Sequence, residues 1–143
     1  MKIILLALLV MSSLYAETFD DYLKRFDYRE REEMKIKSLE AVELYKTGEV
    51  EFVDIRFREE QAVWSFPFMK KIPLNELPNR LNELDKNKTI VTVCPHYDRA
   101  EMARIYLTLK GYKSRYLTDG LLGLAGYLRG DEAKEFVNTV INK

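Results

Sequence analysis

The chain has 143 residues, 47% of them hydrophobic, so it can bury the core of one domain and leaves no room for two full domains. Its 23 Lys and Arg residues equal its 23 Asp and Glu residues in number, which gives no electrostatic reason to expect binding to nucleic acid or to an anionic membrane. The apolar content also excludes a chain that is disordered throughout.

Residues 1–16 have the pattern of a secretory signal peptide. A basic start at Lys2 precedes an unbroken apolar run over 3–11, and a short stretch then ends at the small residue Ala16. The alternative is a membrane anchor, but the apolar run is about half of the roughly 20 residues that a spanning helix needs. We therefore expect export to the periplasm, cleavage after Ala16, and no stable membrane insertion of the remaining chain.

The next residues predict a helical extension followed by the first part of a domain. Apolar residues at helical spacing indicate an N-terminal helical extension over 17–33. A short edge strand over 34–37 begins the domain, and a helix capped by Ser38 then runs to the stop at Gly48. The β-branched and aromatic segment 50–55 is typical of a strand.

The second half of the chain continues this alternation. We expect an ordered loop over 61–73, a helix over 74–84, and over 89–93 the most apolar strand, central in the sheet. The remaining elements are a helix over 99–110 that ends at Gly111, a strand over 113–117, a short helix over 121–128 and an amphipathic helix over 131–141. The predicted domain spans 34–130, and the C-terminal helix of 131–143 packs on it.

This order of elements predicts an α/β fold with a central, mostly parallel sheet and helices on both faces. In such sheets, ligands bind at the carboxyl ends of the strands. Two predicted strand ends carry candidate functional residues: Asp54 and Arg56 at one, and Cys94 at the other.

Cys94 opens the loop Cys94-Pro95-His96-Tyr97-Asp98-Arg99 and is the only cysteine of the chain. It therefore has no partner for an internal disulfide, and it is a poor nucleus for a zinc site, so we expect no metal and no cofactor. The loop leads into a helix, whose N–H groups and dipole favour an anionic sulfur. We expect a lowered thiol pKa, with Arg99 adding positive charge. The alternative is an inert, buried cysteine.

Four landmarks lie in a fixed order along 34–130: Val53-Asp54-Ile55-Arg56, Cys94 and Arg99 separated by four residues, Gly111-Tyr112, and Leu117-Thr118-Asp119-Gly120. In order and spacing they resemble the landmarks of the rhodanese-like domains. The resemblance implies a sulfurtransferase. Cys94 would take sulfane sulfur from a small sulfur-donor anion such as thiosulfate, from polysulfide or from a persulfide. It would hold the sulfur as a persulfide and pass it to a thiol or protein acceptor.

The loop also departs from the family pattern. Tyr97 stands where the family commonly has Gly, Ala100 stands where it has Ser or Thr, and Pro95 removes one N–H donor. These departures support an alternative function, a catalytically weak interaction or sulfur-binding module. A phosphatase is a more distant alternative, because the related phosphatases place five residues between Cys and Arg.

Two further loop residues have alternative interpretations. His96, the only histidine, either supplies charge or a proton near the sulfur or is a solvent-facing loop residue. Asp98 is unfavourable beside an anionic sulfur. We expect its side chain to point away as a helix N-cap, with Glu101 completing a capping box.

Asp54 and Arg56 form the second candidate strand end. In the functional interpretation, Asp54 orients the loop or Arg99, while Arg56 attracts an anionic donor. In the other interpretation they are an exposed pair that contributes little.

Overall fold

The computed structural model describes residues 16–142. The predicted signal peptide, apart from Ala16, lies outside the described residues. In the described part of the chain, no helix has the length and apolar content to cross a membrane.

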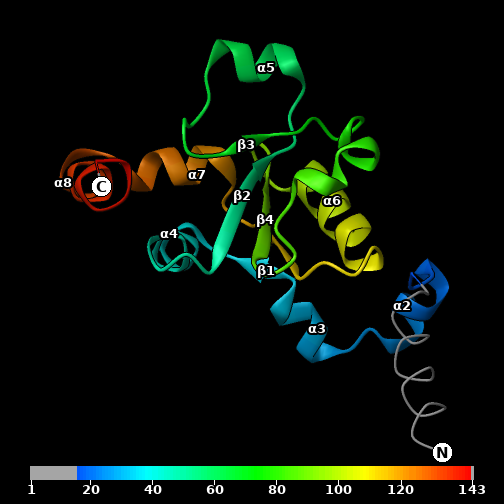
Figure 1. The fold of residues 1–143 in the computed structure, drawn as a ribbon. Helices are drawn as coiled ribbons and strands as arrows, with labels where there is room; N and C mark the ends of the chain where they lie inside the picture. Colours follow the sequence, from blue (N-terminus) through cyan, green and yellow to red (C-terminus); the bar gives the residue numbers. More distant parts are fainter. Residues whose placement is uncertain (1–15, 143) are drawn as a thin grey trace, which may run out of the picture.

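A five-stranded, all-parallel sheet forms the centre of the molecule (Figure 1), in the order β1-β5-β4-β2-β3. The strands are β1 (Lys35–Ile36), β2 (Val50–Asp54), β3 (Lys70–Lys71), β4 (Thr89–Val93) and β5 (Ser114–Leu117). The middle strand is β4, and its residues Ile90, Val91 and Val93 are fully buried. Such burial is typical of an apolar strand that is covered on both faces. The predicted α/β fold is confirmed.

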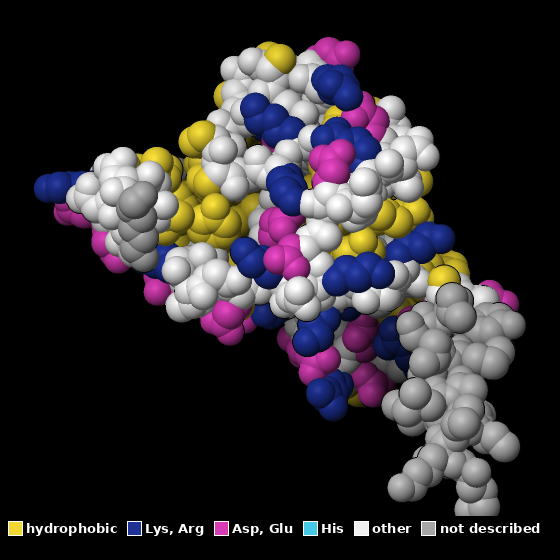
Figure 2. Space-filling model, viewed as in Figure 1, with side chains coloured by type: hydrophobic (Ala, Val, Ile, Leu, Met, Phe, Trp, Pro, Cys, Tyr) yellow, Lys and Arg dark blue, Asp and Glu magenta, His cyan; other side chains and the backbone are white. Residues whose placement is uncertain are grey.

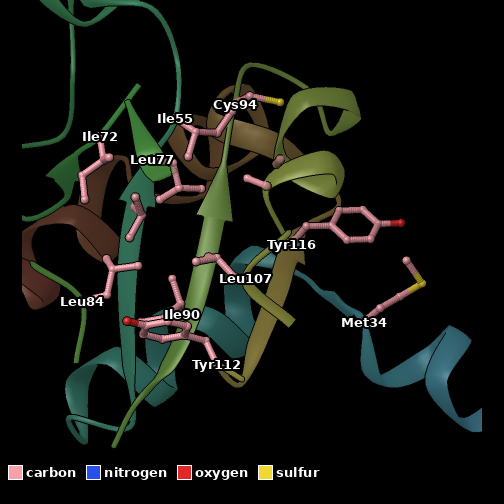
Figure 3. Packing of buried hydrophobic residues seen from close by; sticks show 13 residues of the cluster. Met34, Ile55, Ile72, Leu77, Leu84, Ile90, Cys94, Leu107, Tyr112 and Tyr116 are labelled. Carbon is pink, nitrogen blue, oxygen red and sulfur yellow. The ribbon is translucent and has the colours of Figure 1, made fainter. Parts of the chain in front are cut away.

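Helices cover both faces of this sheet. The α-helices are α2 (Phe19–Arg25), α3 (Tyr28–Glu33), α4 (Ser38–Lys46), α5 (Arg58–Val63), α6 (Asp98–Leu109), α7 (Gly120–Tyr127) and α8 (Gly130–Phe136), with a π-helical turn at Val137–Ile141. One buried cluster joins the sheet to α6 through Ala103 and Leu107, and Figure 3 shows this cluster around β4. The other joins the opposite face to α4 and α7 through Val42 and Leu124.

Several predicted elements differ from the structure. The helix expected over 17–33 is two helices, because Phe26 is extended and Asp27 accepts a hydrogen bond from the N–H of Glu30 to start α3. The helix expected over 74–84 is two 3-10 turns, Leu77–Asn79 and Leu81–Glu83. Pro78 has no N–H to bond back to residue 74, so a continuous α-helix would lack one of its hydrogen bonds there.

Two further differences concern the segment 61–73, which was predicted to be a loop. It contains the strand β3 near its end, and its first residues belong to α5, which begins at Arg58. The α5 helix has six residues and is too short to show apolar periodicity in the sequence. Its N-terminus is closed by Glu60, whose carboxylate accepts from the N–H of Phe57 at 3.0 Å. In Figure 1, α5 lies at the end of the sheet toward which β2 and β4 point.

The helix α4 begins differently from its prediction. Lys37 is its N-cap residue and Ser38 is the first helical residue, so the predicted cap by Ser38 is wrong. The N–H of Ser38 donates instead to the carboxylate of Asp119 at 3.1 Å, which comes from the segment before α7.

Candidate active site

Cys94 follows the last residue of β4 and lies at the carboxyl end of the sheet. The end of β2 lies beside it, because Asp54 is in register with Val93 of β4. Figure 3 shows the Cys94 sulfur directed away from the strand, toward the segment that leads into α6. The residue is 0% exposed, so the sulfur is covered by the loop that it opens.

The Cys94 thiol experiences opposing influences. Backbone N–H groups of His96, Arg99 and Ala100 donate toward the sulfur and favour the thiolate, as the sequence predicted. Burial acts more strongly in the opposite direction, and the Asp98 carboxylate adds to it, so the pKa of the Cys94 thiol is raised above its ordinary value. The prediction of a lowered pKa is therefore wrong, because burial of the sulfur outweighs the backbone N–H groups.

Asp98 lies against the sulfur. Tyr97 is the N-cap residue of α6 and Asp98 is its first residue, which brings the Asp98 Oδ1 atom to 3.7 Å from the Cys94 Sγ atom. In this arrangement the thiol donates to the carboxylate. The expectations that Asp98 caps the helix and points away from the sulfur are both wrong.

Tyr97 does not strain the loop. Its φ is −155°, and positive φ angles occur only at glycines in the part of the chain that the structure describes. The position therefore does not require the left-handed conformation that favours glycine. Its ring is exposed at the surface of the loop.

Arg99 joins the loop to α5. Its guanidinium donates to both carboxylate oxygens of Glu60, at 2.7 and 2.9 Å, and lies 5.7 Å from the centre of the Phe57 ring. The bond to Arg99 is the main reason that the pKa of Glu60 is lowered to about 2. Glu60 was missed as a site residue, because Phe57, three residues before it, has no side-chain acceptor and does not mark a helix start in the sequence.

Asp54 and Arg56 are buried, with 0% and 2% exposure, so the interpretation as an exposed pair is wrong. Their side chains are joined by hydrogen bonds of 2.7 to 3.1 Å, and Arg56 also donates to the carbonyl of Trp64 at 2.8 Å. Asp54 therefore binds Arg56 and not Arg99, and Arg56 is not exposed to attract an anion. Gln61 of α5 donates to the carbonyls of both residues at 3.0 Å, so this cluster fixes α5, which carries Glu60.

The N-terminus of α7 holds the other side of the loop. The N–H of Leu121 donates to the carbonyl of Cys94 at 2.9 Å, and that of Leu122 donates to the carbonyl of Pro95 at 3.4 Å. Gly120 has φ +65°, and a Cβ atom there would clash with the carbonyl oxygens of Pro95 and His96. Because the Pro95 carbonyl is turned toward α7, the N–H of the same peptide, that of His96, is free to face the sulfur. The N–H groups of Arg99 and Ala100 are free because they lie in the first turn of α6.

The His96 side chain is exposed, which favours the interpretation as a solvent-facing residue over a role at the sulfur. Its backbone N–H is the part that faces Cys94. Among residues 16–142, no group of His, Cys, Asp and Glu residues is arranged to hold a metal ion.

Comparison with known proteins gives consistent similarities. The family model "Rhodanese-like domain" matches residues 38–126. The Bacillus subtilis protein named "Putative sulfurtransferase YtwF" is 27% identical over 97 residues, which cover 65% of this chain and 94% of that protein. A protein of Allochromatium vinosum named "Sulfurtransferase" is 33% identical over 69 residues, which cover 48% of this chain and 64% of that protein. The crystal structure of a rhodanese-like domain protein from Staphylococcus aureus superposes with a TM-score of 0.58 at 27% identity, and covers 63% of this chain and 89% of its own.

Proposed function

The chain belongs to the rhodanese-like domain family, and from this premise we propose that it is a sulfurtransferase in which Cys94 carries sulfane sulfur as a persulfide. The observation that carries the proposal is the position of Cys94 at the carboxyl end of β4, with the N–H groups of His96 in the loop and of Arg99 and Ala100 in the first turn of α6 directed toward its sulfur. These N–H groups are hydrogen-bond donors, and they stabilise negative charge on the Cys94 sulfur or on the outer sulfur of its persulfide.

The proposed reaction has two displacement steps. In the first, the Cys94 sulfur attacks the outer sulfur of the donor, an S–S bond to Cys94 forms, and the bond to the donor's remaining part breaks as that part leaves with the electron pair. In the second, a thiol or protein acceptor attacks the outer sulfur of Cys94–S–SH, and the Cys94 sulfur is the leaving group. Thiosulfate, polysulfide and organic persulfides all present such an outer sulfur.

A mass measurement of the intact protein tests this proposal. Treatment with polysulfide should add the mass of one sulfur atom, and cyanide or excess thiol should remove it. Cys94→Ala is the matched control, because it leaves no cysteine in the chain. Equal gains in wild type and Cys94→Ala, or no gain in wild type with any donor, would refute the proposal.

The burial of Cys94 favours a second candidate function. A fully covered thiol with a raised pKa supplies little thiolate at neutral pH. In this second function, the chain is a sulfur-binding or interaction module, which binds sulfur at Cys94 but transfers it to an acceptor only slowly. Single-turnover transfer separates the two functions: a module keeps its loaded sulfur when an acceptor thiol is added, whereas a sulfurtransferase releases it within seconds to minutes.

We also propose that the protein is exported to the periplasm and loses residues 1–16. The support for this is the apolar run over 3–11, followed by the small residue Ala16. Fractionation of cells that express the full chain, followed by N-terminal sequencing of the periplasmic form, tests it. A mature chain that begins at Glu17 is the expected result, and a form in the cytoplasm that still begins at Met1 is the contrary one.

A further inference from the structure

A negative charge lies beside the Cys94 sulfur, whereas the positive charges of the site are paired with carboxylates. The carboxylate of Asp98 lies against the sulfur, with 3.7 Å between the Oδ1 and Sγ atoms. The positive groups of the site are already engaged, because Arg99 is held by both oxygens of Glu60, and Arg56 is buried against Asp54. A donor that approaches Cys94 therefore meets an acidic group first and finds both site arginines held by carboxylates.

Exposed apolar side chains lie beside the polar groups of the loop. Phe57, Tyr97 and Leu122 are 54%, 54% and 52% exposed. Each is tied to the loop: Tyr97 belongs to it, Phe57 lies against the Arg99 guanidinium, and the N–H of Leu122 donates to the Pro95 carbonyl. Side chains of this kind contact the organic part of a donor, but they give no hydrogen bonds to an inorganic anion.

From these contacts, and on the basis of the function proposed above, we propose that Asp98 makes this site selective for organic persulfides that are neutral or positively charged beside the transferred sulfur, and against thiosulfate. Thiosulfate would bring two negative charges to a sulfur that already has a carboxylate beside it. A neutral persulfide avoids this repulsion, and a cationic one is attracted.

Asp98 also accepts and returns the proton that is transferred in this reaction. The carboxylate takes the proton of the Cys94 thiol, the Cys94 sulfur attacks the outer sulfur of R–S–SH, and R–S⁻ leaves. The proton on Asp98 then passes to R–S⁻. The sum is Cys94–SH plus R–S–SH giving Cys94–S–SH plus R–SH, with no oxidant or reductant required. Asp98 is therefore placed as a catalytic residue that also determines specificity.

Donors that differ only in charge test this proposal. The organic part is cationic in cysteamine persulfide, neutral in 2-mercaptoethanol persulfide and anionic in 3-mercaptopropionate persulfide, and thiosulfate extends the series with a dianion. The rate at which Cys94 gains one sulfur is measured by intact mass for the wild type, Asp98→Asn and Glu101→Gln. Glu101→Gln is the matched control, because it removes the same charge from the same turn of α6.

The ratio of rates for the cationic and anionic persulfides is the decisive quantity, because the ionisation of Cys94 cancels in it at fixed pH. We expect this ratio to be high in the wild type, to fall about tenfold in Asp98→Asn, and to change little in Glu101→Gln. It should also shrink as salt is added. A wild-type preference for thiosulfate, or equal ratios in the wild type and Asp98→Asn, would overturn the proposal. If no donor loads Cys94 in any variant, the sulfurtransferase function itself has failed.

Discussion

At the scale of single residues, the chemistry depends on how Cys94 is ionised. Its burial and the nearby Asp98 favour the protonated thiol, while three backbone N–H groups favour the thiolate. The N–H groups do not prevail in the resting protein. They become more important when a persulfide or a leaving group carries the negative charge at the same place.

The pH dependence of alkylation tests this description. Because the pKa of the Cys94 thiol is raised, its rate of reaction with iodoacetamide should increase with pH through an inflection above the ordinary value of 9.0. In Asp98→Asn the inflection should move to lower pH, because a negative charge that opposes the thiolate is gone. Glu101→Gln should leave it in place. An inflection below 9.0 in the wild type would contradict the raised pKa.

Glu60 gives a second prediction at this scale. Its pKa falls from 4.5 to about 2 in the folded protein, so its bond to Arg99 stabilises the fold above pH 4.5 and loses that effect as the pH falls toward 2. Glu60→Gln should therefore unfold at lower urea than the wild type at pH 6, and the difference should narrow below pH 4.5. Glu59→Gln, at the exposed neighbouring position, is the control. A difference that is independent of pH would contradict the ion pair.

At the scale of elements, the loop is held between two helices. α5 holds Arg99 through Glu60, and α7 donates its first N–H groups to the carbonyls of Cys94 and Pro95. The close approach of α7 requires that residue 120 has no side chain. The loop geometry therefore depends on Glu60, which lies 39 residues before Arg99 in the sequence, and on the first residues of α7.

Gly120→Ala tests this close approach. The new Cβ atom would meet the carbonyls of Pro95 and His96, and the residue has φ +65°, so the free energy of unfolding should fall by more than about 1 kcal/mol. Gly48→Ala is a matched control, since Gly48 has φ +80° and its Cβ position is open. Urea denaturation of both variants measures the difference. Equal losses would show that only the backbone conformation, and not the contact with the loop, is responsible.

The sequence predicts the elements best where one strong local pattern decides them. The strand over 89–93 was predicted to the residue, because its apolar run is bounded by polar residues on one side and by Cys94-Pro95 on the other. The predicted end of this strand at Val93 correctly placed Cys94 directly after it. α5 was missed because its helix is short, and with it the partner of Arg99 was missed.

The remaining errors at the site concern long-range burial. The sequence showed that Asp54, Arg56 and Asp98 lie near strand ends, but not that the first two are buried against each other or that the third faces the sulfur. The thiol pKa was predicted with the wrong sign for the same reason: helix N–H groups are visible in a sequence, whereas the desolvation that outweighs them depends on the folded loop.

At the scale of the whole molecule, the site lies at the carboxyl end of the parallel sheet, whereas the N-terminal helices α2 and α3 contact α6 away from the site. Arg104 of α6, which is buried, joins this helix to the N-terminal helices, because it donates to the hydroxyl of Tyr22 in α2 and to the carboxylate of Glu30 in α3. On the face seen in Figure 2, acidic and basic side chains are interspersed and do not gather into one basic patch. The electrostatic selectivity that we propose depends on Asp98, whose carboxylate lies 3.7 Å from the Cys94 sulfur.

The central claim is that Cys94 carries a sulfur atom that it can pass on. The most direct test loads the protein with a persulfide labelled with heavy sulfur, removes the donor, and follows the intact mass and the acceptor after addition of a thiol. One labelled sulfur should enter each wild-type chain and none should enter Cys94→Ala, and the label should then appear in the acceptor. If the label does not enter the wild type, or enters and stays on Cys94 when the acceptor is added, the protein is not a sulfurtransferase of this kind.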